Sequence, residues 1–213
     1  MVEIPNLCWS MGNPYFRVIL NHDCPMYSEI LRATGNYHDE EVRLFAERVR
    51  LHQVCKNALI LEKGQTARSL YYLLEGAIQQ YEIVSDSGPN VIDLHMAGEW
   101  FFNLESLVTQ RPSRVCIEAY TNSKILEVSL ETVHYLTEKS VSFLQLNKIL
   151  EGALPKITFF DQSMTPLEKY KYILDHRPRL IQAFPLRMIS SYLKVTPETL
   201  SRVRNSLAGG GVS

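Results

Sequence analysis

A stretch near the C-terminus, residues 184–204, predicts two short helices joined by a tight turn. Apolar side chains of the first helix fall on one helical face, at Met188, Ile189, Tyr192 and Leu193. Pro185 suits the first helical position, where its missing N–H costs nothing. After a turn at residues 194–196, Thr196 can cap a second helix, with Pro197 at its first position. Leu200 and Val203 then point inward, which indicates a helix-turn-helix.

The outer face of the second helix carries Glu198 and Arg202, which lie one turn apart on the same side. A helix of this size fits the DNA major groove. There an arginine can bind the O6 and N7 edge of guanine, and a carboxylate can accept from the cytosine amino group. A surface ion pair is the alternative interpretation of this spacing. Their position at the N-terminal end of the second helix favours base reading.

Charge is distributed unevenly along the chain. The whole chain has a net charge of −1, yet residues 165–207 contain eight Lys or Arg and three Asp or Glu, a net +5. The positive charge therefore gathers around the predicted DNA reader, as expected for a protein that binds nucleic acid.

Residues 57–129 predict short strands separated by turns. The expected strands are 58–61, 70–74, 77–84, 91–96, 115–119 and 124–128. Strands at this spacing with glycine turns are typical of a β-sandwich or roll. Helical patterns flank this region: an amphipathic helix is expected over residues 38–54 and another over residues 130–160, where Pro155 should bend or end it.

The segment Val195–Arg202, with the sequence VTPETLSR, resembles the start of the recognition helix in the Crp/Fnr family of bacterial transcription factors. The resemblance implies an α+β fold. It consists of an N-terminal double-stranded β-helix (a jelly roll of the cyclic-nucleotide-binding kind), a long dimerisation helix and a C-terminal all-α helix-turn-helix domain. The expected boundaries are 1–25 for an atypical extension, 26–130 for the sensor roll, 131–162 for the dimerisation helix and linker, and 163–213 for the DNA-binding domain.

By the same resemblance, Glu198 and Arg202 correspond to the family's base-reading acid and arginine, and Thr199 to a phosphate contact. Ser201, Lys194 and Arg204 are also expected to contact the DNA backbone. The expected partners are double-stranded DNA and a second copy of the chain, because a helix-turn-helix reads paired half-sites when symmetry sets their spacing. The resemblance also allows contact with RNA polymerase. The apolar side chains along one face of the helix expected over residues 130–160 can pack against the same helix of a second copy or against their own roll. Packing in a dimer is favoured.

The family's cyclic-phosphate cassette combines a Gly-Glu pair with an Arg followed by Ser or Thr. Gly98 and Glu99 are present here, but the second pair has the inverted order Ser113-Arg114. A shift of one position along a strand turns a side chain to the opposite face, so Arg114 should point away from the pocket. We assign Gly98, Glu99, Ser113 and Arg114 to the effector pocket and do not expect cyclic AMP as its ligand. Another small-molecule effector, or none, is expected.

Several functional classes find little support in the sequence. No apolar run reaches the 18 residues of a membrane span and no signal peptide is expected, which favours a cytoplasmic protein without membrane contact. The four cysteines are too dispersed for an iron–sulfur cluster. The six histidines are scattered, so we expect no catalytic residue, metal ligand or cofactor.

Two alternatives to a DNA-binding regulator stay open. One is an effector-sensing module that has lost DNA binding and contacts a protein partner. The more remote one is a cupin-like metal enzyme, which needs histidines that converge inside the roll.

Overall fold

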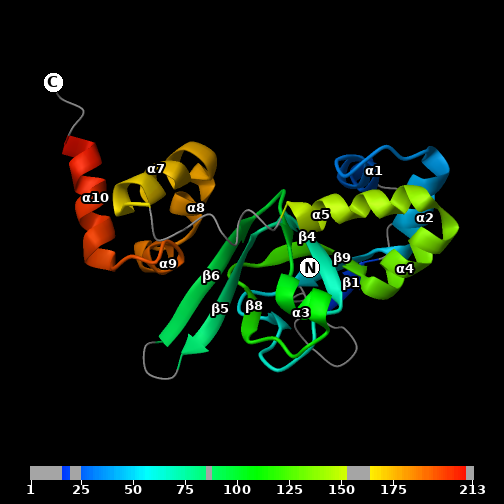
Figure 1. Ribbon diagram of the computed structural model, residues 1–213, viewed down its shortest axis with the longest axis horizontal. Coiled ribbons are helices and arrows are strands. Elements are labelled where there is room, and N and C mark those ends of the chain that lie inside the picture. Colours follow the sequence, from blue (N-terminus) through cyan, green and yellow to red (C-terminus); the bar gives the residue numbers. More distant parts are fainter. Residues whose placement is uncertain (1–15, 20–24, 85–87, 153–163, 210–213) are drawn as a thin grey trace, which may run out of the picture.

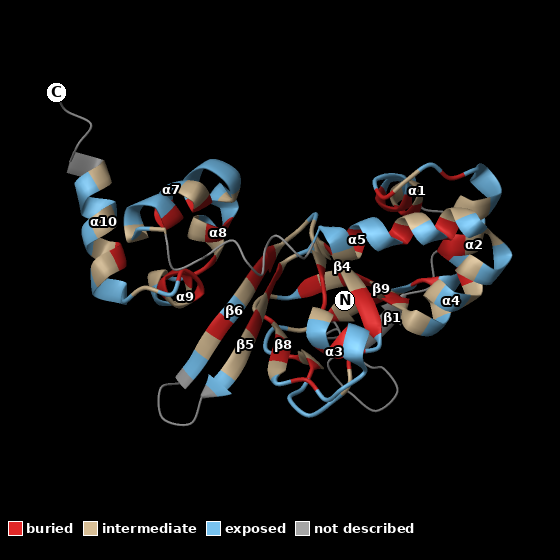
Figure 2. Ribbon diagram, viewed as in Figure 1, coloured by how far each residue is buried: buried red, intermediate tan, exposed pale blue. Residues whose placement is uncertain are grey.

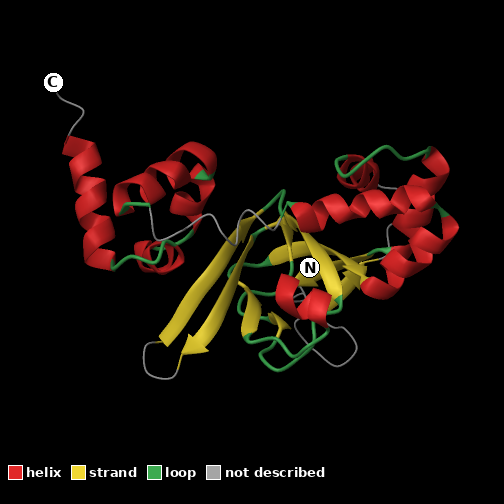
Figure 3. Ribbon diagram, in the orientation of Figure 1, coloured by secondary structure: helices red, strands yellow, loops and turns green. Residues whose placement is uncertain are grey.

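The computed structural model describes residues 16–19, 25–84, 88–152 and 164–209. Its two antiparallel sheets have the strand orders β1-β2-β9-β4-β7 and β3-β8-β5-β6. The strands of the first sheet are β1 (Phe16–Ile19), β2 (Arg50–Val54), β9 (Ser123–Ser129), β4 (Ser69–Glu75) and β7 (Trp100–Phe101). Those of the second are β3 (Leu59–Leu61), β8 (Val115–Ala119), β5 (Ala77–Val84) and β6 (Gly88–Met96). The α+β fold with an N-terminal β-roll is therefore confirmed (Figures 1 and 3).

Each strand predicted from the sequence corresponds to an observed strand, and β5 and β8 have the predicted bounds. Residues 85–87, between β5 and β6, lie outside the described residues. The helix expected over residues 38–54 was too long. Helix α2 (Asp39–Arg48) ends where Val49 turns to an extended conformation, and β2 follows directly. The reason is that residues 50–54 pair with β9, where alternate side chains, His52 and Val54, enter the interior.

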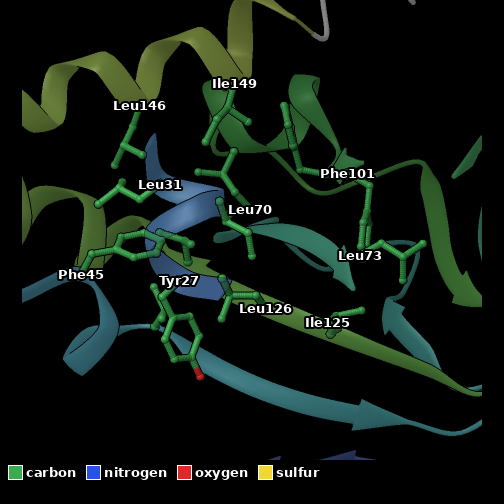
Figure 4. Close-up of a cluster of buried hydrophobic side chains, with 14 of the residues drawn as sticks. Tyr27, Leu31, Phe45, Leu70, Leu73, Phe101, Ile125, Leu126, Leu146 and Ile149 are labelled. Carbon is green, nitrogen blue, oxygen red and sulfur yellow. The ribbon is translucent and has the colours of Figure 1, made fainter. Parts of the chain in front are cut away.

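Helices cover one end of the roll and complete its core. They are α1 (Pro25–Arg32), α2, α4 (Leu130–Lys139), the 3₁₀ helix η1 (Val141–Leu146) and α5 (Asn147–Glu151), with α3 (Leu104–Thr109) on the side. Figure 4 shows apolar side chains from these helices and from the strands in one cluster. Leu31 and Phe45 of the helices are fully buried there with Leu73 and Ile125 of the strands.

The long helix expected over residues 130–160 is interrupted at Ser140, which corrects the sequence prediction. Ser140 is extended, with φ −151° and ψ 132°, and its hydroxyl hydrogen-bonds the carboxylate of Glu41 on α2 and accepts from the backbone N–H of Ser142. Beyond the break, Phe143, Leu146 and Ile149 enter the core of their own roll. Leu144 and its neighbour Val141 face outward. Pro155 and residues 153–163 lie outside the described residues.

The C-terminal domain consists of α7 (Pro166–His176), α8 (Pro178–Ala183), α9 (Leu186–Tyr192) and α10 (Pro197–Gly209). Its buried side chains form a second hydrophobic cluster, which also includes Ala77 of β5 and Val91 and Leu94 of β6. The domain therefore packs on the β5–β6 hairpin, with α10 on the side away from the roll (Figures 1 and 2). None of the helices in the described part of the chain has the length and apolar character needed to cross a membrane.

Candidate nucleic-acid interface and effector cavity

Local sequence sets the geometry of the turn between α9 and α10. Pro185 is the N-cap of α9, one position before the helical place expected for it. Lys194 adopts a left-handed conformation, with φ 57°, and the chain changes direction there. The hydroxyl of Thr196 then accepts from the backbone N–H of Thr199 at 3.2 Å, which satisfies one of the free donors at the start of α10.

Helix α10 has one buried and one exposed side. Leu200 is fully buried against the C-terminal core, which fixes the rotation of the helix. Glu198 and Arg202 are exposed, as predicted, and neither joins an ion pair among the described residues. The carboxylate and the guanidinium therefore lie one turn apart with their hydrogen-bonding groups open to a ligand.

The residues expected to contact the DNA backbone are arranged less uniformly. Arg204 is exposed, whereas Thr199 and Ser201 are half-buried, and the Thr199 hydroxyl accepts from Thr196 at 3.0 Å. Lys194 departs from the expected arrangement, because its ammonium contacts the roll. It donates to Asn90 Oδ1 at 2.9 Å and to the Val91 carbonyl oxygen at 2.7 Å.

Burial lowers the pKa of Lys194, against the opposing effect of Glu82, and the nearby Lys169 lowers it further. In this arrangement Lys194 is a contact between domains rather than a free phosphate ligand. The reason is that β6 is an edge strand, and its outer backbone groups need partners.

Other side chains of the C-terminal domain also bind the free edge of β6. The hydroxyl of Ser191 accepts from the backbone N–H of Val91 at 2.9 Å. Within the domain, the buried Lys169 donates to the carbonyl oxygen of Leu193 at the end of α9, at 3.1 Å. Sequence reasoning did not assign a role to either residue.

Arg177, at the junction of α7 and α8, makes several contacts between the domains. Its guanidinium donates to Glu99 Oε2 at 2.7 Å and to the carbonyl oxygen of Leu94 at 2.6 Å, and it lies 3.6 Å from Asp93 Oδ1. It also donates to the Tyr192 hydroxyl at 2.8 Å.

The charges around Arg177 compensate for its burial. Burial alone would lower the pKa of Arg177, but Tyr192 and the carboxylates of Glu99 and Asp93 raise it above its ordinary value. Burial raises the pKa of the Tyr192 phenol. The arginine is therefore a permanent cation held by acidic partners on the roll.

A cavity of about 610 Å³ lies beside these contacts. Its wall combines roll residues, Lys148 and Ile149 of α5, and Tyr192 and Lys194 of the C-terminal domain. The roll contributes Asp93, His95 and Glu99, together with aromatic side chains at residues 100–102. A ligand in this cavity would thus touch the sensor roll, α5 and the helix-turn-helix at once.

The four residues assigned to the effector pocket separate into two pairs. Gly98, with φ 97°, and Glu99 line the cavity. Ser113 and Arg114 are not among its lining residues, and their assignment to the effector pocket stays a prediction. The Ser113 hydroxyl donates to the carbonyl oxygen of Val115, and the exposed Arg114 guanidinium lies 3.3 Å from Glu105. Arg114 lies in the bend before β8, and its side chain is exposed.

The described residues hold no group of three or more His, Cys, Asp or Glu side chains placed to bind a metal ion. His95, on β6, contacts Gln80, Asp93 and Glu99.

Comparison with known proteins identifies the roll and relates the fold to solved structures. Residues 51–140 match the family of the cyclic nucleotide-binding domain. FixK2 from Bradyrhizobium japonicum superposes with a TM-score of 0.60 at 20% identity, covering 77% of this chain and 86% of its own. The search of curated proteins gave no significant match.

Two further solved structures have a similar fold. The c-di-GMP-responsive global regulator CLP of Xanthomonas campestris has a TM-score of 0.56 at 16% identity, covering 82% of this chain and 94% of its own. The catabolite activator protein of Thermus thermophilus has a TM-score of 0.50 at 18% identity, with coverages of 83% and 86%.

Proposed function

We propose that this chain, which carries a cyclic nucleotide-binding domain and has the fold of the Crp/Fnr regulators, is a DNA-binding transcription regulator. The resemblance drawn from VTPETLSR is confirmed at the level of the fold. Two copies of the chain would read a palindromic operator, with one α10 in each major groove. A cytoplasmic location and contact with RNA polymerase belong to the same proposal.

One observation carries this proposal. Glu198 and Arg202 are exposed one turn apart near the start of α10, while Leu200 between them is buried and holds the helix in that orientation. An arginine so placed can bind guanine through two hydrogen bonds, and the glutamate can accept from cytosine. The positive charge of residues 165–207 supports DNA as the partner.

The proposal includes an effector other than cyclic AMP at the roll. The side chain of Arg114 is 71% exposed and paired with Glu105, so it does not supply the guanidinium that the family's cassette offers to a cyclic phosphate. The cavity instead offers Glu99, which already binds Arg177 of the C-terminal domain. Occupation of this cavity is therefore linked to the position of the helix-turn-helix.

The contact of Lys194 with the roll favours a second candidate, a sensor whose C-terminal domain contacts a protein. In this arrangement the Lys194 ammonium already donates to two oxygen atoms of the roll. The two candidates differ in what the exposed face of α10 binds.

Selection of duplexes from a random library with the purified protein tests the proposal. We expect enrichment of an inverted repeat whose half-sites lie about 34 Å apart, one turn of B-DNA. Each half-site should contain a guanine that depends on Arg202. If no sequence is enriched over the starting library at low salt, the protein-binding alternative replaces the proposal.

A further inference from the structure

The wall of the cavity beside β6 holds a buried polar atom that no described residue satisfies. His95 lines the cavity and is 2% exposed, and its Nδ1 has no hydrogen-bond partner among the described residues. We propose that this cavity binds a small organic carboxylate with an apolar body, which accepts a hydrogen bond from His95. The inference names the chemical class of the effector in the proposed function, and only its consequence for DNA rests on that function.

The contacts of His95 establish which ring nitrogen carries the hydrogen. Gln80 Nε2 lies 2.9 Å from His95 Nε2 and also donates to the carbonyl oxygen of Phe102 at 3.3 Å. The amide nitrogen of Gln80 therefore faces the ring, and His95 Nε2 accepts from it. Asp93 Oδ2 is farther from the same nitrogen, at 3.4 Å. In a neutral ring whose Nε2 accepts, the hydrogen is on Nδ1, so Nδ1 is a donor that needs an acceptor.

Among the described residues, no acceptor lies within hydrogen-bond distance of this donor. Glu99 Oε2 is 3.6 Å from His95 Nδ1, which is too long for a hydrogen bond. That oxygen already accepts from the Arg177 guanidinium at 2.7 Å and from the Met96 backbone N–H at 3.4 Å. A buried donor without a partner is unfavourable, so Nδ1 at the cavity wall indicates an acceptor from outside the chain.

The charges around the cavity favour a ligand with one negative charge. Four cations and three carboxylates lie in the wall or pair with it: Lys148, Lys194, Arg114 and Arg177, and Asp93, Glu99 and Glu105. One positive charge is therefore in excess. Lys148 joins no ion pair in the described part of the chain, and the Lys194 ammonium has a third hydrogen besides the two that it donates to the roll. A monoanion neutralises the excess, whereas a cation would increase it.

Apolar side chains in the wall favour an organic anion over an inorganic one. Trp100, Phe101 and Phe102 line the cavity from the roll, and Ile149 lines it from α5. These side chains can remove an apolar body from water. The volume of about 610 Å³ is that of a small-molecule site and exceeds the space of a single water. Arg114, which the family resemblance assigned to the pocket, does not line this wall, so a cyclic nucleotide is not the expected ligand.

A carboxylate in this cavity would also act between the domains. Lys148 belongs to α5 and Lys194 to the helix-turn-helix, and both line the cavity. A ligand that contacts both ammonium groups would join these two elements through one charge. Binding would then favour the arrangement in which the C-terminal domain packs on β6. The effect of this preference on DNA follows only if the chain is a regulator.

The direct test compares three molecules of similar shape: phenylacetate, the neutral phenylacetamide and the cation phenethylammonium. Trp100 lines the cavity, and a Trp9→Phe background leaves it as the sole tryptophan. We expect a saturable change in Trp100 fluorescence with phenylacetate, weaker binding of phenylacetamide, which keeps an acceptor but loses the charge, and none of phenethylammonium. Sodium chloride keeps the ionic strength equal. Equal affinity for anion and cation would overturn the proposal. So would the absence of saturation by phenylacetate up to about 10 mM, the range expected for a ligand of this size.

Two variants test the contacts. His95→Gln keeps an acceptor for the Gln80 amide and removes the Nδ1 donor, so it should weaken phenylacetate binding about ten-fold. Lys148→Met keeps the length of the side chain and removes its charge, which should weaken binding about three-fold. Lys63→Met is the matched control, because Lys63 is exposed and does not line the cavity.

Circular dichroism checks the fold of each variant. Unchanged affinity in folded His95→Gln would overturn the proposal, since water alone would then satisfy Nδ1. If His95→Gln does not fold, Lys148→Met decides, and a loss no greater than that of Lys63→Met would overturn the proposal. Displacement of phenylacetate by micromolar cyclic AMP would also overturn it, because the cavity would then be a cyclic nucleotide site.

DNA selection with the same proteins separates this inference from the proposed function. A failed titration together with an enriched operator removes only the carboxylate site. A clear titration without any selected DNA sequence removes only the regulator function.

Discussion

At the scale of single residues, the domains are held together by side chains whose partners are distant in sequence. Arg177 and Glu99 are 78 positions apart, and Lys194 and Asn90 are 104 apart. No local pattern in the sequence identifies such pairs. A weak signal existed at Arg177, because an arginine before Pro178 ends one helix and begins the next. The exposed Glu198 and Arg202 could be predicted, since helical periodicity alone determines their face.

A second residue-scale feature is the polar cluster of His52, Ser69 and Glu127 inside the first sheet. Glu127 Oε2 lies 2.7 Å from His52 Nε2, and Ser69 donates to Oε1 at 2.7 Å. Burial raises the pKa of Glu127, but the hydrogen bonds from His52 and Ser69 outweigh it and bring the pKa below its ordinary value. The ionised carboxylate therefore stabilises the folded state.

This cluster predicts how stability depends on pH. Because the pKa of Glu127 is lower in the folded chain than in the unfolded chain, its contribution is complete above the ordinary value of 4.5 and is lost as the pH falls through the folded value. Glu127→Gln should lower the free energy of unfolding at pH 7 by about 2 kcal/mol and flatten its decline in acid. Urea denaturation across this pH range measures both effects. The exposed Glu47→Gln is the control, and an equal acid decline in wild type and Glu127→Gln would contradict the assignment.

At the scale of elements, the sequence predicted the bounds of the strands more accurately than those of the helices. Strand β5 was predictable because Gly76 and Gly88 flank it, and β8 because its apolar residues lie between the turn segments 112–114 and 121–123. Strand β2 was not predicted, because its residues were included in the expected helix 38–54. Its partner β9 lies far along the chain, so no local pattern indicates the pairing. The break at Ser140 was not predicted, because apolar residues do recur at helical spacing along this segment. After the break, Phe143 and Leu146 pack into the core of their own roll. Period alone does not reveal which surface a helix covers.

The segment after this break still offers a surface for the proposed homodimer. Val141 and Leu144 lie three positions apart on η1 and are 75% and 53% exposed. Large apolar side chains exposed side by side suggest a contact with another copy. Leu144→Arg should convert a dimer to a monomer, because association would bury an unpaired charge.

Light scattering coupled to gel filtration measures this change in mass. Val108→Arg is the matched control, since Val108 is 64% exposed on a different helix, α3. A wild-type chain that is monomeric, or a Leu144→Arg chain with the mass of a dimer, would exclude η1 as the dimer contact.

At the scale of the whole molecule, the roll and the C-terminal domain share one hydrophobic cluster. Leu94 of β6 is fully buried and packs with Leu180, Phe184 and Ile189 of the C-terminal domain. The arrangement couples the roll to the C-terminal domain through a packed contact as well as through Arg177. The domain boundary predicted near residue 163 therefore separates the chain in sequence, but the two parts meet at the β5–β6 hairpin.

Because both parts of the chain contribute to this cluster, a substitution that leaves a cavity at β6 should also affect the C-terminal domain. Leu94→Ala should destabilise the chain by about 2–5 kcal/mol, since it removes a fully buried side chain. Hydrogen exchange should accelerate more in α7 and α9 than it does in Leu126→Ala, whose cavity lies in the roll core. Identical exchange of α7 and α9 in the two variants would show that the domains are not coupled through this contact.

The most direct test of the central claim is a double-mutant cycle between Arg202 and one guanine of the selected operator, measured by fluorescence anisotropy at fixed salt. Replacing that guanine by adenine should weaken binding of the wild-type chain by about 1–3 kcal/mol. Arg202→Ala should bind both duplexes with equal affinity, because the contact that distinguishes them is gone. If Arg202→Ala loses as much affinity for the changed duplex as the wild-type chain does, Arg202 does not read this base and the account of α10 is wrong.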